Sequence, residues 1–103
     1  MRDRLATLRK LVAENPGNLL AQYGLAMACA GAGHFEEALA GFRQVLAMDP
    51  DYAVAYFQTG QAQEKLGRLE EARQTYQRGI EVTTRLGQHH ARQQLESALE
   101  LLG

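Results

Sequence analysis

The 103-residue sequence lacks the features that several special classes of protein require. A single cysteine, Cys29, excludes an internal disulfide and makes a reducing cytoplasm the default location. No run approaches the ~20 apolar residues of a membrane-spanning helix. The arginines that follow the initial methionine interrupt any apolar run that could serve as a signal peptide. The net charge of −1 gives no overall attraction to nucleic acid or to an anionic membrane.

Metal-binding and catalytic motifs are also missing. The sequence has no CxxC and no histidine pair at i and i+4, and the adjacent His89 and His90 point about 100° apart on a helix, so we expect no zinc site. Residues 31–33 contain two glycines but lack the preceding strand of a phosphate-binding loop, so no nucleotide cofactor is expected. No nucleophile, base and orienting group can be assembled, which argues against an enzyme.

The strongest feature that is present is a repeat with a spacing of about 34 residues, a period within the range of stacked repeat architectures. Gly33, Glu36, Glu37 and Ala38 return as Gly67, Glu70, Glu71 and Ala72, and Tyr23, Phe42 and Leu46 return as Phe57, Tyr76 and Ile80. Self-similarity at a fixed period indicates one supersecondary unit stacked on itself, because each unit cannot bury its apolar face alone.

Every segment between turn signals has helical periodicity, and none alternates like a strand. The predicted helices cover about residues 2–14, 19–31, 35–48, 52–65, 69–86 and 88–102. Asn18 is the predicted N-cap of the second helix, and Asp49-Pro50-Asp51 is expected to end the third and cap the fourth. The fifth helix is expected to be longer, since Thr84 stands where Pro50 would recur.

The acidic pairs and the cysteine have structural interpretations. Residues 36–37 and 70–71 fall in the first turns of helices, where carboxylates complement the helix dipole, and this explains them better than acid–base chemistry. Cys29 is expected to be a buried, unreactive thiol and not a nucleophile.

The period and its key positions resemble the tetratricopeptide repeat family. Residues 19–52 supply Leu25, Ala26, Cys29, Gly33, Ala38, Phe42 and Pro50 at the family's places, and residues 53–86 supply Tyr56, Gly60, Gly67, Ala72, Tyr76 and Gly79. Residues 1–18 resemble part of a further repeat, and residues 87–103 resemble a capping helix. The resemblance implies an all-α, right-handed superhelical stack of antiparallel helix pairs, of the small stand-alone kind found in bacteria.

The pattern also predicts which side chains fill the interior. Phe42 and Tyr76 are expected between the units, and small residues at 26, 38, 60, 72 and 79 should let the helices approach closely. The departures from the family pattern are Gln22, Cys29, Thr59, Gln63 and Thr84. They are expected to loosen individual contacts without changing the fold.

The resemblance implies a non-enzymatic module that binds a peptide segment or a partner protein in its concave groove. The family's groove positions correspond here to Leu20, Tyr23, Gly24, Met27, Val54, Phe57, Gln58, Gln61 and Arg92, and secondarily to Ala30, Gly31, Glu64, Lys65, Gln88 and Ala91. Chaperone-binding members hold a terminal carboxylate with lysines and asparagines. Because Tyr23 and Met27 occupy two of those places, we expect no such clamp and a groove with an apolar base.

Two alternatives remain open at this point. Some of the groove side chains, Tyr23, Met27 and Phe57 among them, can instead belong to the core between helices. The groove or the capping helix can also be covered by a second copy of the chain, which would make the protein a self-assembling homodimeric scaffold.

Overall fold

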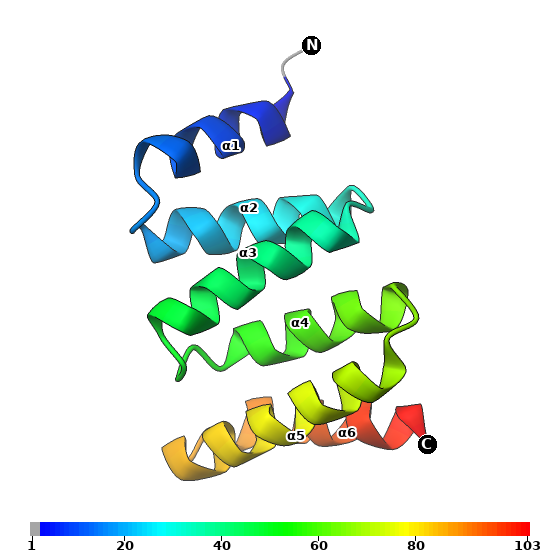
Figure 1. Ribbon diagram of the computed structural model, residues 1–103. Coiled ribbons are helices and arrows are strands. Elements are labelled where there is room, and N and C mark those ends of the chain that lie inside the picture. Colours follow the sequence, from blue (N-terminus) through cyan, green and yellow to red (C-terminus); the bar gives the residue numbers. More distant parts are fainter. Residues whose placement is uncertain (1–2) are drawn as a thin grey trace.

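The computed structural model describes residues 3–103, and within that range the chain forms six α-helices and no strand (Figure 1). The helices are α1 (Arg4–Glu14), α2 (Leu19–Gly31), α3 (Phe35–Met48), α4 (Val54–Lys65), α5 (Leu69–Leu86) and α6 (His89–Leu102). Three of them have the predicted bounds, and α4 and α6 begin one or two residues late. The predicted start of the first helix at residue 2 lies outside the described residues.

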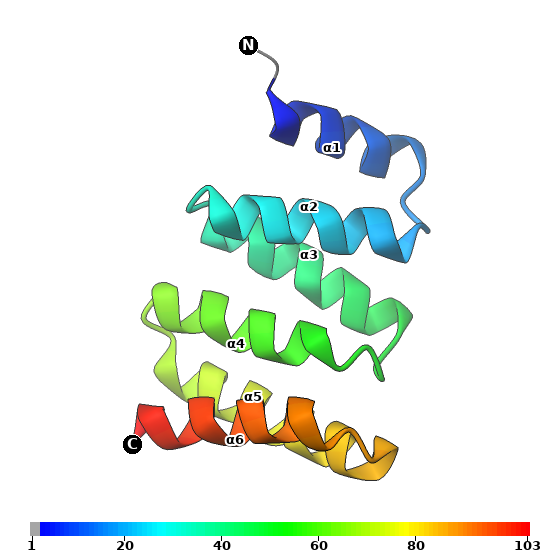
Figure 2. The same cartoon turned by 180° about the vertical axis from the view of Figure 1, so that it is seen from behind.

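The helices are stacked as antiparallel neighbours in two layers. Each helix packs on the next one in the chain, and α4 also contacts α2 and α6. Figure 2 shows α2, α4 and α6 together on one side, with α3 and α5 behind them. We call the side formed by α2, α4 and α6 the inner layer, and the side formed by α1, α3 and α5 the outer layer. The predicted all-α superhelical stack of helix pairs is confirmed.

Most turns form at residues whose side chains or conformational freedom favour a helix start or end. The Asn18 side chain accepts a hydrogen bond from the Ala21 backbone N–H at 3.1 Å, as expected of an N-cap. Gly33, Gly67 and Gly87 end α2, α4 and α5 with φ values of 84°, 76° and 71°, a conformation that glycine adopts without steric cost.

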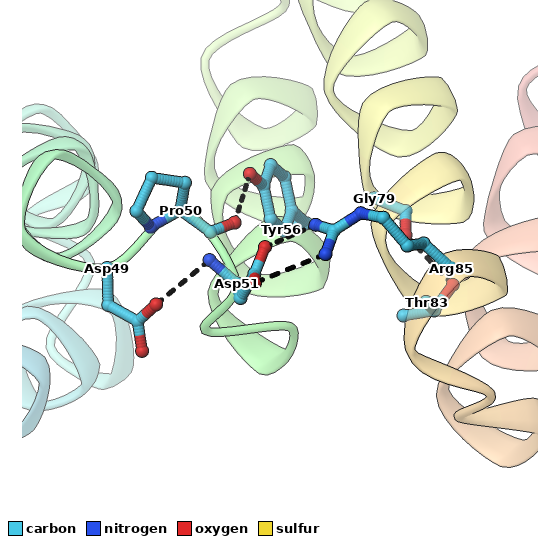
Figure 3. A network of polar contacts seen from close by, with 7 residues as sticks. All are labelled: Asp49, Pro50, Asp51, Tyr56, Gly79, Thr83 and Arg85. Carbon is cyan, nitrogen blue, oxygen red and sulfur yellow. Dashed lines mark hydrogen bonds and ion pairs between the residues drawn. The ribbon is translucent and has the colours of Figure 1, made fainter.

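The predicted cap of α4 is wrong. Ala53 precedes the helix, and no side chain caps it. The Asp49 carboxylate instead accepts from the Asp51 backbone N–H at 3.0 Å, and Asp51 forms an ion pair with Arg85 of α5 (Figure 3). Arg85 reaches Asp51 because α5 is longer than α3 by four residues, as the missing proline predicted.

The core contains two clusters of buried side chains, one between α2 and α3 and one among α4, α5 and α6. Phe42 packs with Ala26, Cys29 and Ala38 between α2 and α3, and it is fully buried. The second cluster joins α4, α5 and α6 and contains Tyr56, Ala72, Tyr76, Leu95 and Ala98. The predicted interior positions of Phe42 and Tyr76 are thus confirmed.

Close helix contacts require the small residues. A Cβ atom added at Gly79 would lie 2.7 Å from the Tyr56 Cβ, and one added at Gly60 would overlap the ring of Tyr76. In the first pair, a Cβ at Gly41 would lie 2.9 Å from the Ala26 Cβ. These separations are below van der Waals contact, so the helices approach closely only because the side chains are absent.

Gln22 departs from the family pattern but makes the same kind of hydrogen bond as Tyr56, its counterpart in the next repeat. Its Nε2 donates to the Pro16 carbonyl oxygen at 3.1 Å, and at the corresponding position of the next repeat the Tyr56 hydroxyl donates to the Pro50 carbonyl oxygen at 2.6 Å. Both side chains are buried. Glutamine and tyrosine therefore satisfy the same turn carbonyl in the two repeats. The expectation that Gln22 loosens a packing contact stays a prediction.

Ion pairs link successive outer helices at the same spacing. Arg9 of α1 binds Glu37 of α3 at 2.7 Å, and Arg43 of α3 lies 3.5 Å from Glu71 of α5. The hydrogen bond from Arg9 lowers the pKa of the Glu37 carboxyl. The first-turn glutamates therefore connect the outer helices as well as facing the helix dipole.

Candidate interaction surface

The exposed side of the inner layer carries apolar side chains in two matching stripes. In α2 the stripe contains Leu20, Tyr23 and Met27, and in α4 it begins with Val54 and Phe57. Leu20 is 70% exposed, Val54 50% and Met27 37%, so three large apolar residues of this one layer are in contact with solvent. No residue of α2 is charged. This surface is therefore apolar along its first half.

The two aromatic residues of the stripes belong partly to the core. The ring centroids of Tyr23 and Phe42 are 5.9 Å apart, and those of Phe57 and Tyr76 are 6.4 Å apart, so the same aromatic pair occurs in both helix pairs. Tyr23 also lies edge-on to Tyr52, with 5.3 Å between centroids. Tyr23 and Phe57 are half-buried, so each ring packs against the core on one side and lines a hollow on the other. The groove and core interpretations of these two residues are therefore both partly correct.

The first hollow on this surface lies between α1 and α2 and has a volume of about 580 Å³. Tyr23, Gly24 and Met27 line it from α2, with Leu5 and Arg4 from α1. Burial raises the pKa of the Tyr23 phenol, with a further contribution from Tyr52. We call this space the amino-terminal hollow.

The second hollow, the carboxyl-terminal hollow, lies between α4 and α6 and has a volume of about 460 Å³. Phe57, Gln61 and Glu64 line it from α4, and Ala98 and Leu101 are among its residues from α6. Leu101 is 89% exposed. This hollow therefore combines an aromatic ring, an exposed leucine and one carboxylate.

A buried tyrosine reaches the side chains of the carboxyl-terminal hollow. The Tyr76 hydroxyl donates to the Glu64 carboxylate and accepts from Gln61 Nε2 at 2.6 Å. Burial, followed by the hydrogen bond to Glu64, raises the pKa of the Tyr76 phenol well above its ordinary range. The network fixes Gln61 and Glu64, because their partner is held rigidly in the core.

The structure groups the predicted groove residues unevenly. Tyr23, Gly24 and Met27 meet at the amino-terminal hollow, and Phe57 and Gln61 meet at the carboxyl-terminal hollow. Leu20, Val54 and Gln58 belong to the same two helices but line neither of these hollows.

Arg92 is not brought together with the others. It lines neither hollow, and its Nε lies 4.0 Å from the Glu96 carboxylate. Leu95 and Ala98 of α6 are buried in the core cluster with Tyr76. This packing sets the rotation of α6 about its axis and thereby the position of Arg92.

Sequence reasoning missed the α6 residues that do line the carboxyl-terminal hollow. Gln94, Ser97 and Leu101 follow one another at i, i+3 and i+7, beside the buried stripe of the same helix. The sequence did contain a pattern that could have identified them. The apolar stripe of α6 shows which side of the helix is buried, and the residues beside that stripe face α4.

Residues 3–103 can be compared with what metal-binding proteins, membrane proteins and thiol enzymes require. There, no three histidine, cysteine or acidic residues are grouped so that they could hold a metal ion. Within the same residues, no helix is both long enough and apolar enough to cross a membrane. Cys29 is buried, and burial raises the pKa of its thiol, which disfavours the reactive thiolate.

Known proteins with a similar sequence or structure point to one family. A TPR repeat-containing protein of Pseudomonas aeruginosa is 27% identical over 92% of this chain and 90% of its own length. The crystal structure of a tetratricopeptide repeat domain protein from Salinibacter ruber has a TM-score of 0.76 and 30% identity, and covers 82% of this chain and 94% of that one.

A third similar structure shows the fold alone, because its sequence identity is 22%. It is the first TPR of Spaghetti, bound to the HSP90 peptide SRMEEVD. Its TM-score is 0.80, and the match covers 95% of this chain and 73% of that one.

The tetratricopeptide repeat family model matches residues 30–85, more than half of the chain. The fold of this family generally mediates protein–protein interaction, and its members are typically not enzymes. The helix pairs, their regular spacing along the chain and this match agree, and the chain belongs to the tetratricopeptide repeat family.

Proposed function

We propose that the protein is a non-enzymatic interaction module that binds an extended or helical segment of a partner protein along the exposed side of its inner layer. The observation that carries this proposal is the exposure of Leu20, Met27 and Val54 on α2 and α4. Contiguous apolar surface of this kind usually marks an interaction site on a soluble protein.

The chemistry of the surface favours a mainly apolar segment. Tyr23 provides a rigid anchor with a polar tip, and Met27 can adapt to the shape of a bound side chain. The uncharged α2 offers nothing to hold a terminal carboxylate at its end of the surface. The peptide bound to the first TPR of Spaghetti supports the general mode of binding, whereas Tyr23 and Met27 argue for a different peptide chemistry.

Peptide display tests the proposal directly. A library of short random peptides is selected against the purified protein, and the Kd of the enriched peptides is measured by fluorescence polarisation. We expect enriched peptides with two or more large apolar residues, and a large loss of affinity in Leu20→Ser/Met27→Ser, because both substituted side chains are exposed and fold stability should be retained.

The matched control is Leu69→Ser. Leu69 begins α5 in the outer layer and is 50% exposed, so the substitution removes similar apolar surface at a different place. Peptides that bind Leu20→Ser/Met27→Ser as tightly as the unmodified protein, or that lose affinity equally in Leu69→Ser, would show that the inner layer is not the binding surface.

A second candidate is a homodimer formed through the groove or the capping helix. It is favoured by Leu101, which is 89% exposed beside the carboxyl-terminal hollow. Light scattering at micromolar concentration separates the candidates. A dimer that becomes a monomer in Leu101→Ser supports self-assembly, and a monomer at all concentrations supports the adaptor.

The same proposal includes the division of the chain and its location. We assign residues 1–18 to a partial repeat, 19–52 and 53–86 to two full repeats, and 87–103 to a capping segment, which the spacing of the repeated residues supports. A cytoplasmic location fits a chain whose only cysteine is a buried free thiol.

A further inference from the structure

A third hollow lies between α3 and α5, and residues of α4 form its floor. Figure 1 views the molecule from the side of α3 and α5, opposite to the view of Figure 2. The volume of the hollow is about 360 Å³, within the range of small-molecule sites. Arg43 of α3 and Glu71 and Arg78 of α5 are among its wall residues, and Thr59 and Gln63 of α4 belong to the floor. We call this space the outer pocket. It shares no residue with the two inner hollows.

The repeat provides an internal comparison for the outer pocket. Two wall residues have identical counterparts one repeat earlier, where Arg9 and Glu37 correspond to Arg43 and Glu71. Other positions change from small or apolar to polar: Leu25, Cys29, Ala40 and Gly41 correspond to Thr59, Gln63, Gln74 and Thr75. Gln44 corresponds to Arg78, which adds a positive charge. Both helix pairs thus carry charged residues at this place, and the second pair has four more polar side chains around them.

Packing does not require these polar residues. The first pair buries Cys29 where the second pair buries Gln63, so the fold accepts a non-amide side chain at that position. Placing polar groups there has a desolvation cost unless each finds a partner. In the second pair the Thr59 hydroxyl donates to the Ala55 carbonyl oxygen at 2.6 Å, and the Thr75 hydroxyl donates to Gln63. These bonds offset the cost for the two hydroxyl groups, whereas the Gln63 amide nitrogen is left for solvent or a ligand.

The donors of the outer pocket are only partly satisfied. Gln63 is 5% exposed, and its Oε1 accepts from the Thr75 hydroxyl at 2.7 Å. Within residues 3–103 its amide nitrogen makes no hydrogen bond, although Gln63 lines the pocket. In the same range Arg78 forms no ion pair. Arg43 makes one long ion pair, in which its guanidinium lies 3.5 Å from the Glu71 carboxylate. The amide N–H pair of Gln63 and the exposed guanidinium of Arg78 therefore line the pocket as accessible donors.

We propose that the outer pocket binds the oxyanion of a small organic molecule, a carboxylate or a phosphate. The guanidinium of Arg78 matches such a group with two parallel N–H donors, and the Gln63 amide supplies a neutral donor from the floor. Arg43 supplies a second positive charge once its long contact to Glu71 is shared with the ligand. The outer pocket shares no residue with the two inner hollows, so an experiment can contradict the proposed anion site without contradicting the proposed peptide surface.

Titration of the ¹⁵N-labelled protein by NMR tests the proposal. The probes are inorganic phosphate and glutarate, each added at constant ionic strength and pH. We expect saturable shifts of the Arg78 Nε–H and the Gln63 side-chain amide, and the probe with the higher affinity identifies the oxyanion. Arg78→Gln should weaken that affinity by at least about tenfold, because a charge-assisted hydrogen bond is lost.

The period-matched control is Gln44→Ala, which alters the corresponding position of the first helix pair and should leave the affinity unchanged. Gln63→Met, which removes the amide at similar volume, should also weaken binding. Shifts that increase linearly without saturation, or that are the same in Arg78→Gln, would overturn the proposal. A pocket that responds to neither probe and only to an acidic peptide would overturn it in favour of a second protein contact.

Discussion

The helix pairs α2–α3 and α4–α5 have the same architecture but bury different side chains. Phe42 fills the first pair and Tyr76 the second, and both are fully buried. The close approach is provided by Gly41 on the outer helix of the first pair and by Gly60 on the inner helix of the second. The comparison shows that total volume and shape fix the fold, while the identity of each side chain can vary.

The two pairs differ more at their surfaces than in their packing. The Tyr76 hydroxyl holds Gln61 and Glu64 at the inner surface, whereas Phe42 has no polar group, and Met27 and Ala30 occupy the corresponding positions. The outer pocket shows the same trend on the opposite side. The repeat therefore keeps one aromatic ring at the centre of each pair and varies the polar groups around it.

The largest effect is expected from emptying the interior of either pair. Phe42→Ala and Tyr76→Ala should each lower the free energy of unfolding by about 3–5 kcal/mol, because each removes a fully buried ring. Urea denaturation followed by circular dichroism measures both. A loss below ~1 kcal/mol in both variants would mean that these rings do not form the core.

The next effect tests the glycine contact in the second pair. Gly60→Ala should destabilise by about 1–3 kcal/mol, since the added methyl group meets the Tyr76 ring. Gly24→Ala is the control within a helix, because nothing lies within 4 Å of its added Cβ. It should stabilise the protein by roughly 0.5–1 kcal/mol through the helix propensity of alanine. Equal changes in the two variants would rule out the steric explanation.

A smaller effect compares the hydrogen bonds to the two proline carbonyls. Tyr56→Phe and Gln22→Met each remove the donor and retain most of the apolar volume. Each should cost about 0.5–1.5 kcal/mol, the usual net value of one hydrogen bond. If only one of them is destabilising, Gln22 and Tyr56 are not equivalent despite their matching positions.

The smallest effect concerns pH and the ion pairs between outer helices. Because Arg9 lowers the pKa of Glu37 from its ordinary value of 4.5, the pair stabilises the fold above that pH, and the contribution is lost as the pH falls below it. The melting temperatures of the wild type and Arg9→Gln should therefore differ slightly at pH 7 and converge once the pH falls below the lowered pKa of Glu37. Arg43→Gln, which breaks the longer contact, should differ less. A difference that persists well below that pH would contradict this assignment.

The fold could be predicted because its determinants are local. Apolar periodicity, Asn18, Gly33 and Gly87 fixed most helix bounds within two residues. The role of Asp51 could not be read in the same way, since its partner Arg85 is distant in the sequence and is reached only because α5 is long.

The candidate site was harder to predict than the fold. The groove positions taken from the resemblance lie on α2 and α4, where the helix rotation repeats from one pair to the next. Arg92 lies on α6, whose Leu95 and Ala98 are buried in the core cluster with Tyr76, and it lines neither inner hollow. This packing is a tertiary effect that the repeat pattern does not describe. The outer pocket also depends on three helices at once, so no single sequence pattern indicated it.

The ion pair between Arg85 and Asp51 makes the length of α5 a constraint on the chain (Figure 3). Arg85 lies in the last turn of that helix, beyond the point where its outer-layer counterpart α3 would have stopped. Inserting one residue upstream in the helix would rotate Arg85 by about 100° about the axis and direct it away from the loop. Natural variants of this protein should therefore tolerate substitutions along α5 much better than single-residue insertions or deletions.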